Sequence, residues 1–228
     1  MNKKAAIFQS WEANAENWIQ TIENAEIESR NLVTNAAIVA AVLKYHPRKV
    51  LDLGCGEGWL TRRLQEAGMQ AQGIDGIPAL IENARSKGGA FEVISYEDII
   101  AGKAISGSSF DAIVINFALL DKENTEALLQ KLPDLLLPSG FIFIQTLHPF
   151  SGITPETPYA EGWREGSWQG LKRDFTHSYQ WYYRTLESWS AAFRQADLAI
   201  IEIIEPLHPK TWQPASVIFV LKARLDIL

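Results

Sequence analysis

Short apolar runs alternate along the chain with longer stretches in which apolar residues recur every three to four positions. The runs are rich in Val, Ile and Phe, as buried strands are, and the longer stretches have the period of amphipathic helices. This alternation predicts an α/β fold in which helices cover a mostly parallel, doubly wound sheet. The predicted strands are residues 48–53, 69–75, 90–94, 110–116, 140–146, 198–204 and 215–221.

Helices are predicted on both sides of the first strand and between later ones. The connection over residues 99–109 has no clear period and is expected to be irregular. Pro78 suits the first turn of a helix, where its missing N–H costs nothing. The predicted helices are residues 6–20, 26–46, 58–67, 78–87, 122–132 and 184–196.

The link between the last two strands, "EPLHPKTWQPA", contains Pro206, Pro209 and Pro214. A parallel crossover usually needs a helix of a dozen or more residues, which these prolines prevent. The seventh strand is therefore expected to run antiparallel to the sixth.

Length and composition narrow the class of protein. With 228 residues, of which 47% are hydrophobic, the chain is expected to form a single domain over 1–228. The formal net charge of −6 and the lack of a basic run argue against a nucleic-acid partner. No stretch approaches the roughly 20 apolar residues of a membrane span, and no signal-peptide pattern is present. A cytoplasmic protein without a membrane partner is expected.

Cys55 is the one cysteine of the sequence. It excludes an internal disulfide and a metal site built on cysteines, so no metal is predicted. The oligomeric state cannot be read from the sequence.

The stretch "VLDLGCGEG" ends the first predicted strand and leads directly into a helix. Glycines at this point let a ligand approach the free N–H groups and positive dipole end of the helix. A dinucleotide fingerprint would need glycine where Trp59 stands, and the Gly-Lys-Ser/Thr of a phosphate-binding loop is absent. Asp52, within the turn, favours a ligand with a cationic group.

Asp75 ends the second predicted strand in "GID". A carboxylate there can accept hydrogen bonds from two ribose hydroxyls. Alternatively, it is a solvated strand end or caps the helix that begins near Pro78. If Asp75 binds ribose hydroxyls, then Asp75 and the glycine turn together indicate a ligand that has a ribose and no diphosphate.

Four segments in order, "VLDLGCGEG", "GID", "FDAIVINFALL" and "LLLPSGFIFIQTLHP", resemble the motifs of class I S-adenosylmethionine-dependent methyltransferases. They cover roughly residues 48–148. The resemblance implies a Rossmann-like sheet in the order 3-2-1-4-5-7-6 with strand 7 antiparallel, and S-adenosylmethionine as cofactor.

The same resemblance implies roles for individual residues. Many relatives have an acidic residue where Ser95 stands, so Glu97 and Asp98 are alternative adenine contacts. Trp18 and Arg30 would close over the methionine end, unless they are a core tryptophan and a surface arginine. The implied cofactor contacts are Gly54, Gly56 and Gly58 for methionine, Asp75 and Gly76 for the ribose, Ser95 and Tyr96 for adenine, and Asn116, Phe117 and Ala118 for the sulfonium end.

Nine of the 24 aromatic residues fall between residues 150 and 183, interleaved with glycine and polar residues. This aromatic-rich insert, placed at 149–183, follows the fifth strand at the ligand-binding edge of the sheet, while residues 5–46 would form a helical cap. Tyr159, Trp163, Trp168 and Tyr182 are predicted to line a pocket for a planar acceptor. In the alternative, the aromatics only pack the insert against the sheet.

His148, in "QTLHPF", follows the fifth strand. An unperturbed imidazole can accept a proton from a hydroxyl near neutral pH, so His148 is the predicted catalytic residue. Alternatively, its ring bonds backbone groups and anchors the insert.

The resulting hypothesis is methyl transfer to an oxygen or nitrogen of a small, planar or aromatic molecule. The alternative is an inactive S-adenosylmethionine-binding sensor or partner subunit, which would need no enclosed second pocket. A nicotinamide oxidoreductase is opposed by Trp59.

Overall fold

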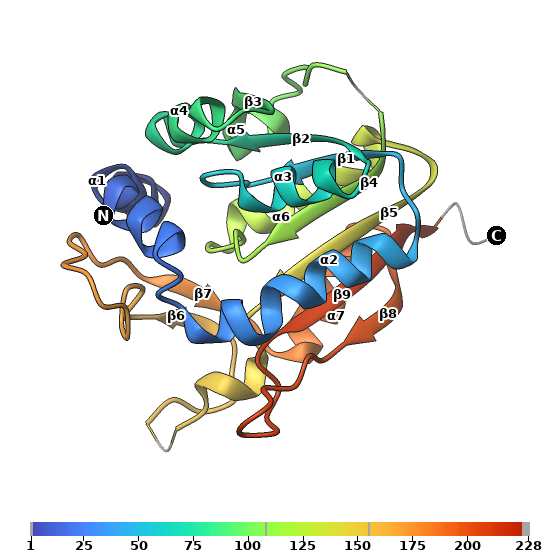
Figure 1. Ribbon diagram of the computed structural model, residues 1–228. Helices are drawn as coiled ribbons and strands as arrows, with labels where there is room; N and C mark the ends of the chain where they lie inside the picture. Colours follow the sequence, from blue (N-terminus) through green and yellow to red (C-terminus); the bar gives the residue numbers. More distant parts are fainter. Residues whose placement is uncertain (1, 108, 155, 225–228) are drawn as a thin grey trace.

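A seven-stranded sheet in the order β3-β2-β1-β4-β5-β9-β8 forms the centre of the molecule (Figure 1). The computed structural model describes residues 2–107, 109–154 and 156–224. All pairs are parallel except those of β9, which runs antiparallel to both β5 and β8. The predicted fold class, strand order and reversed last strand are confirmed. The strands are β1 (Lys49–Leu53), β2 (Gln70–Asp75), β3 (Ala90–Val93), β4 (Phe110–Asn116), β5 (Leu136–Thr146), β8 (Leu198–Ile204) and β9 (Val217–Ala223).

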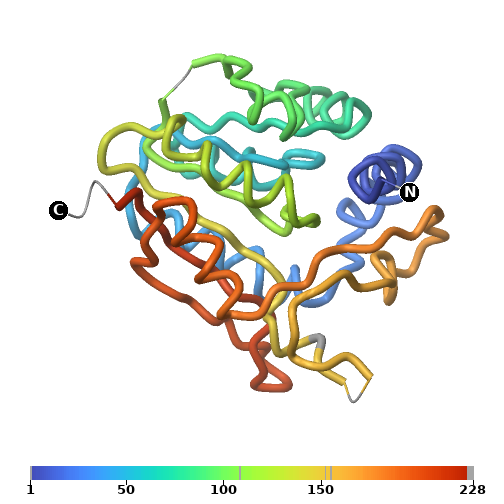
Figure 2. The backbone as a smooth tube through the Cα atoms, turned by 180° about the vertical axis from the view of Figure 1, so that it is seen from behind, coloured from blue at the N-terminus to red at the C-terminus, as the bar shows by residue number. Residues whose placement is uncertain are grey.

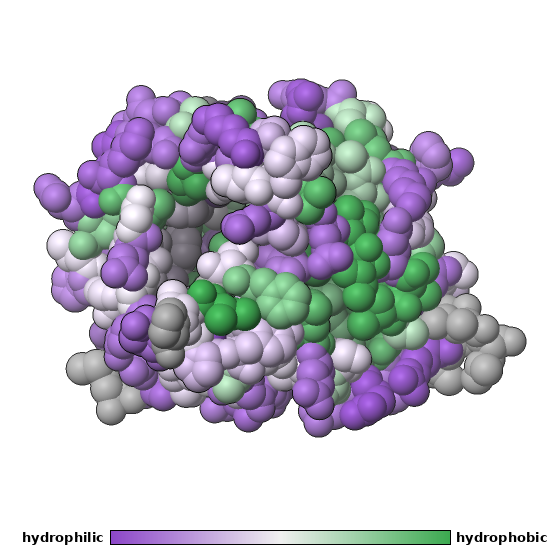
Figure 3. Space-filling model, turned by 90° about the horizontal axis from the view of Figure 1, so that it is seen from below, coloured by the Kyte–Doolittle hydropathy of each residue, from purple (hydrophilic) through white to green (hydrophobic). Residues whose placement is uncertain are grey.

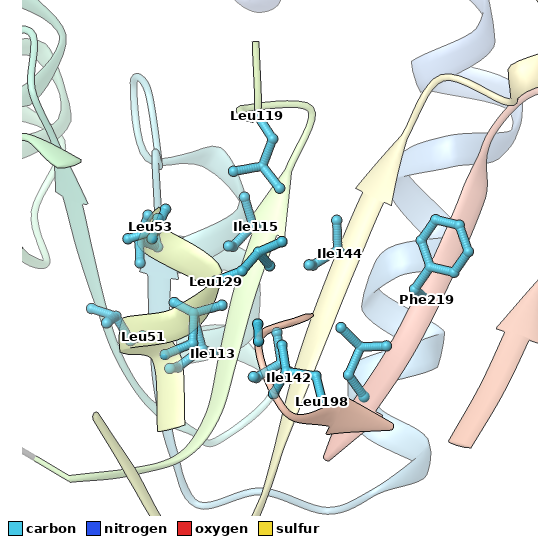
Figure 4. Packing of buried hydrophobic residues seen from close by; sticks show 14 of the residues in the cluster. Leu51, Leu53, Ile113, Ile115, Leu119, Leu129, Ile142, Ile144, Leu198 and Phe219 are labelled. Carbon is cyan, nitrogen blue, oxygen red and sulfur yellow. The ribbon is translucent and has the colours of Figure 1, made fainter. Parts of the chain in front are cut away.

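Helices cover both faces of the sheet because successive strand residues point to opposite sides. Leu51 and Leu53 belong to the core beneath α5, α6 and α7, which Figure 4 shows from close by. Val50 packs on the other face, beneath α2 and α3. The helices are α1 (Lys3–Glu23), α2 (Asn35–Lys44), α3 (Trp59–Glu66), α4 (Pro78–Ser86), α5 (Tyr96–Ile100), α6 (Glu123–Lys131) and α7 (Leu186–Gln195), with a π-helix η1 (Arg30–Thr34) and 3-10 turns η2 (Leu132–Leu135) and η3 (Pro149–Gly152).

The predicted N-terminal cap divides into two parts with different positions. Helix α2 packs on the sheet through Ile38, Ala41 and Val42. Helix α1 instead lies beyond the carboxyl ends of the strands, next to the insert, as Figures 1 and 2 both show. Only α1 and η1 therefore occupy the position expected of a cap.

Two segments have more regular structure than the sequence predicts. Ser95 and Asp98 form a capping box that begins the short helix α5, which was not predicted and ends at Ile100, at the start of the connection over 99–109 expected to be irregular. The insert contains an antiparallel hairpin of β6 (Gly162–Arg164) and β7 (Trp181–Tyr183). Pro155 of the insert, Met1 and residues 225–228 of the predicted domain lie outside the described residues.

None of the helices within the described ranges combines the length and the apolar character that a membrane span needs.

Candidate active site

A cavity of about 570 Å³ lies at the carboxyl ends of the parallel strands, under α1 and the insert. Its volume is in the usual range for small-molecule sites. Seen from below, the surface of the molecule is hollowed (Figure 3). The predicted residues that line the cavity are Trp18, Arg30, Gly54, Gly56, Asp75, Gly76, Ser95, Tyr96, Asn116, Phe117, Ala118, His148, Trp168 and Tyr182.

The glycine turn between β1 and α3 forms one wall. Gly54, Gly56 and Gly58 all have positive φ angles, of 75°, 57° and 81°. A Cβ atom on Gly54 would lie 2.5 Å from the Tyr96 hydroxyl and 2.6 Å from Ala118 Cβ. Glycine is required there for both reasons, and the backbone stays open to a ligand.

Asp75 contributes its carboxylate at the end of β2. Oδ2 accepts the backbone N–H of Gly56 at 2.9 Å, and Oδ1 accepts that of Ile77 at 2.8 Å. Burial raises the pKa of Asp75 to about 6, against the lowering effect of these backbone bonds. A carboxylate has about four acceptor positions, so two remain for a ligand. Asp75 thus holds the turn that precedes α4, but it is not the N-cap of that helix, which is Ile77 without a side-chain capping bond.

Asp52 and Gly58 do not line the cavity. Asp52 points to the face of the sheet under α3, where Oδ2 accepts the hydroxyl of Thr61 at 2.7 Å. Burial raises the pKa of Asp52 to about 7. Gly58 allows close packing, because a Cβ atom there would lie 2.5 Å from Phe91. The predicted contacts of Asp52 and Gly58 with a ligand are therefore replaced by structural roles in this turn.

Arg30, Trp18 and Glu57 gather at one end of the cavity. Arg30 is 9% exposed and its guanidinium lies over the rings of Trp18 and Trp59, at 5.6 and 5.1 Å. The indole N–H of Trp18 donates to Glu57 Oε2 at 3.2 Å. Burial lowers the pKa of Arg30, and nearby Glu57 and Asp52 raise it. This end therefore holds a buried cation and a buried carboxylate that are not hydrogen-bonded to each other.

Six buried side-chain atoms in the described ranges have no hydrogen-bond partner. Four of them belong to residues that line this cavity: Arg30 Nη2, Thr34 Oγ1, Glu57 Oε1 and Asn116 Oδ1. Unpaired buried polar atoms are costly and need an explanation. Their concentration around one cavity indicates a ligand with both donors and acceptors.

Ser95 and Tyr96 line the wall beyond β3. The Ser95 hydroxyl accepts the N–H of Asp98 within the capping box, and Tyr96 donates to the carbonyl of Ala118 at 3.1 Å. Glu97 accepts a bond from Asn124 at 2.6 Å. Glu97 lines the cavity and Asp98 does not, which leaves Ser95, Tyr96 and Glu97 as candidate contacts.

The segment after β4 has an unusual backbone. Phe117 has a φ of 55°, and its N–H donates to the carbonyl of Gln145 at 2.8 Å. A bulky residue with positive φ is rare and concentrates at functional sites. The turn directs Asn116 and Ala118 to the cavity.

His148 is 1% exposed and both of its ring nitrogens are engaged. Nδ1 accepts the N–H of Phe150 at 3.2 Å, and Nε2 lies 2.8 Å from Glu205 Oε1. With Nδ1 as acceptor, Nε2 carries the proton and donates it to Glu205. The geometry favours the anchoring alternative, because no ring nitrogen is free to take a proton from a substrate.

The four aromatic residues predicted to bind substrate fall into two pairs. Trp168 and Tyr182 line the cavity, but Tyr159 and Trp163 do not. The Tyr159 hydroxyl accepts the N–H of Leu186 at 2.9 Å. Trp163 packs edge-on against Tyr182 at 5.3 Å. Tyr159 and Trp163 therefore help to pack the insert. This agrees with the alternative in which aromatic residues of the insert only pack it against the sheet.

The insert and α1 are joined directly above the cavity. Asn14 bonds both backbone groups of Thr176, at 2.7 and 2.8 Å. The Trp168 indole donates to Ser10 Oγ at 2.9 Å, and the Trp168 ring meets Trp11 edge-on at 4.9 Å. We use the name roof for α1 together with insert residues 167–179, several of which bond to α1.

Comparison with known proteins assigns the family. The methyltransferase domain family matches residues 27–203, which is most of the chain. The chain belongs to the class I S-adenosylmethionine-dependent methyltransferases. This membership confirms the family, the enzyme class and the cofactor that the sequence motifs imply.

Individual relatives are more distant. A ubiquinone biosynthesis O-methyltransferase of Xanthomonas axonopodis pv. citri is 34% identical over 116 residues, which is 48% of this chain and 47% of the relative. The chain thus spans about half the length of the curated relatives it matches.

Two solved structures share the fold. An S-adenosylmethionine-dependent methyltransferase from Mesorhizobium loti has a TM-score of 0.63 at 21% identity, over 82% of this chain and 95% of its own. One from Bacteroides fragilis, in complex with S-adenosyl-L-homocysteine, has a TM-score of 0.60 at 19% identity, over 82% and 76%.

The methyltransferase cofactor fits the unpaired atoms around the cavity. Its carboxylate would suit the Arg30 guanidinium, and its ammonium would suit the acceptors Glu57 Oε1 and Asn116 Oδ1. Sequence reasoning missed Glu57, although an acidic residue between two glycines of the turn was a visible signal. It also missed Thr34, whose π-helical position has no sequence signal, and Arg184, which directly follows the aromatic run of β7.

Proposed function

We propose that this methyltransferase transfers a methyl group from S-adenosylmethionine to an oxygen or nitrogen of a small, planar molecule. The observation that carries the proposal is a cavity with two unlike ends under one roof. One end has the glycine turn, Asp75 and the unpaired polar atoms. The other is lined by Trp181, Tyr182 and Trp189 and suits a flat, apolar acceptor.

In this proposal the protein acts mainly by positioning. S-adenosylmethionine supplies a methyl group already activated by its sulfonium. Arg30, Glu57 and Asp75 hold the cofactor, and the turn at Asn116–Ala118 also lines the cavity. The roof excludes water from both ends, so that an acceptor can be held in line. His148 anchors η3 and β5 beside the aromatic end through Phe150 and Glu205.

The sensor alternative predicts cofactor binding without turnover. The aromatic end favours the enzyme, since a sensor needs no second enclosed space. The test is to titrate the protein with S-adenosylhomocysteine by calorimetry, and then to measure its release from S-adenosylmethionine in the presence of phenols, catechols and aromatic amines. Binding without release on any acceptor class would support the sensor.

Gly54→Ala gives a matched test of the cofactor end. The new Cβ would collide with Tyr96 and Ala118, so binding of S-adenosylhomocysteine should be lost. Gly68→Ala is the control, because Gly68 also has a positive φ, of 92°, but nothing lies within 4 Å of its added Cβ. If both variants bind as the wild type does, the glycine turn is not the cofactor site.

A further inference from the structure

Arg184 is a buried cation at the aromatic end of the cavity. Its side chain is 3% exposed, and the residue lines the cavity next to Tyr182 and Trp189. The guanidinium lies 4.9 Å from the ring centre of Tyr182 and 5.3 Å from that of Trp189. Nothing in the cofactor end of the site accounts for this charge.

The protein uses only one of the three guanidinium nitrogens. Nη2 donates to Glu126 Oε1 at 3.0 Å and to the carbonyl of Lys122 at 3.4 Å. Nε and Nη1 have no partner in the described part of the chain, and neither is closed off from solvent. Arginine has five N–H donors, so three remain, one on Nε and two on Nη1. These donors point to different sides of the guanidinium, so each of them can give a carboxylate oxygen a separate charge-assisted hydrogen bond.

We infer that Arg184 forms a carboxylate-binding subsite, and that the methyl acceptor is an aromatic carboxylic acid. This inference rests on the proposed function and adds the class of acceptor to it. Tyr182 and Trp189 hold the ring of the acceptor, and the free N–H donors of Arg184 bind its carboxylate. The methyl-accepting atom is then a different group on the ring.

The distribution of charge favours a single negative charge on the acceptor. The Lys and Arg side chains that line the described cavity are Lys4, Arg30 and Arg184. Lys4 donates to Asn124, and Arg30 lies at the cofactor end beside Glu57. Of these three, Arg184 is the one that lies over the rings of Tyr182 and Trp189, and Glu126 already offsets part of its charge. Lys122, which is not among the lining residues, lies 5.4 Å from the Tyr182 ring, and the carboxylates Glu97 and Asp121 also line the cavity. A carboxylate, with a single charge, matches the one cation that lines this end of the described cavity better than a phosphate dianion does.

Arg184 also joins α6 to the segment before α7, and its removal could affect stability as well as binding. The experiment therefore compares acids with their own amides. The probes are 3-hydroxybenzoate, 4-hydroxybenzoate, 3,4-dihydroxybenzoate and 4-hydroxycinnamate, each with its carboxamide. Their affinities are measured by calorimetry, with and without saturating S-adenosylhomocysteine, for the wild type, Arg184→Met, Glu126→Gln and Arg63→Met. Arg63 is the matched control, because it pairs with Glu66 on the exposed side of α3.

For the wild type, at least one acid should bind about tenfold or more tightly than its amide, the effect of a hydrogen-bonded charge pair. Arg184→Met should abolish this ratio and Arg63→Met should leave it unchanged. Glu126→Gln should raise it, because Arg184 would no longer be shared with a protein carboxylate. A purely structural Arg184 predicts lower melting temperatures in both Arg184→Met and Glu126→Gln, with no change in the ratio.

The inference is overturned if no acid binds, if acids and amides bind alike, or if the ratio survives in Arg184→Met. If Arg184→Met does not fold, an unchanged ratio of acid to amide affinity in Glu126→Gln is by itself enough to overturn the inference. A failure of the proposed function gives a different result, because the protein would then not bind S-adenosylhomocysteine in the calorimetric titration. The ratio measured without S-adenosylhomocysteine tests the subsite in either case.

Discussion

Lowering the pH should weaken the binding of S-adenosylhomocysteine through Asp75. In the proposed site the ribose hydroxyls would donate to the ionised carboxylate, and burial has raised the pKa of Asp75 to about 6. At pH 7.5 nearly all of the carboxylate is ionised, but at pH 5 only about one part in eleven is. If binding requires the ionised form, the dissociation constant should rise about tenfold between pH 7.5 and pH 5.

Calorimetric titrations at pH 5.0, 6.0 and 7.5 test this expectation on the wild type and on Asp75→Asn. The variant should bind more weakly at pH 7.5, by about 1.5 to 3 kcal/mol for the lost charged acceptor, and its affinity should change little with pH. Asp134→Asn, an exposed carboxylate outside the cavity, is the control and should keep the wild-type slope. Asp52, with its pKa raised to about 7, and Glu57 are the other acidic groups beside the turn.

A constant affinity of the folded wild type from pH 7.5 to pH 5 would refute this role of Asp75. If the dissociation constant of Asp75→Asn still rose as the pH fell, the dependence would be assigned to Asp52. The stability of the free protein should show the opposite trend. Because the folded state binds the Asp75 proton more tightly than the unfolded state, the free energy of unfolding should fall as the pH rises from about 4 to about 6.

Three further predictions concern the anchor, the turn and the roof. His148→Gln should lower the free energy of unfolding by about 1 to 3 kcal/mol in urea titrations, without the roughly 10²- to 10⁴-fold loss of kcat that follows removal of a general base. Asp52→Asn keeps an acceptor for Thr61 and removes a buried charge, so unfolding at pH 8 should need more urea than in the wild type, with unchanged cofactor affinity. Asn14→Ala breaks both bonds to the insert and should speed dissociation of S-adenosylhomocysteine in stopped-flow measurements.

Each of these predictions has a distinct contrary result. A large loss of kcat with normal stability in His148→Gln would restore the base role. Weakened cofactor binding in Asp52→Asn would show that its charge reaches the ligand. Asn17→Ala is the control for Asn14→Ala, because Asn17 makes a single exposed bond to the carbonyl of Asp174. Equal dissociation rates in these two variants would mean that the roof does not retain the cofactor.

The centre of the sheet was predictable because strands such as β4 and β9 are buried on both faces and read as largely apolar runs. The β6–β7 hairpin was not, since each strand has only three residues and β7 is held by a long-range bond from Tyr182 N–H to the carbonyl of Leu120. Helix α5 could have been found, because Ser95 and Asp98 have the spacing of a capping box. Its short length hid its helical period.

Some residues of the candidate site could likewise be predicted from the sequence, and others could not. Backbone positions such as Gly54 and Asp75 follow from the spacing of motifs at strand ends. Asp52 was placed wrongly because the turn was considered without strand alternation. Leu51 and Leu53 face α6, so the residue between them must face α3. One of the two ring bonds of His148 is made with Glu205, which is 57 residues away, and no local pattern reveals it.

Residues on one face of helix α1 contact both the insert and the glycine turn, at the two ends of the cavity. Asn14 and Trp18 are four residues apart and therefore lie on the same side of the helix. Asn14 bonds the insert at Thr176, and Trp18 bonds Glu57 in the glycine turn. Lifting the insert while α1 stays in place breaks the first pair of bonds, and moving α1 away breaks both contacts. The cover over the acceptor and the cover over the cofactor are thus coupled, so a change at Asn14 should alter the release of both ligands.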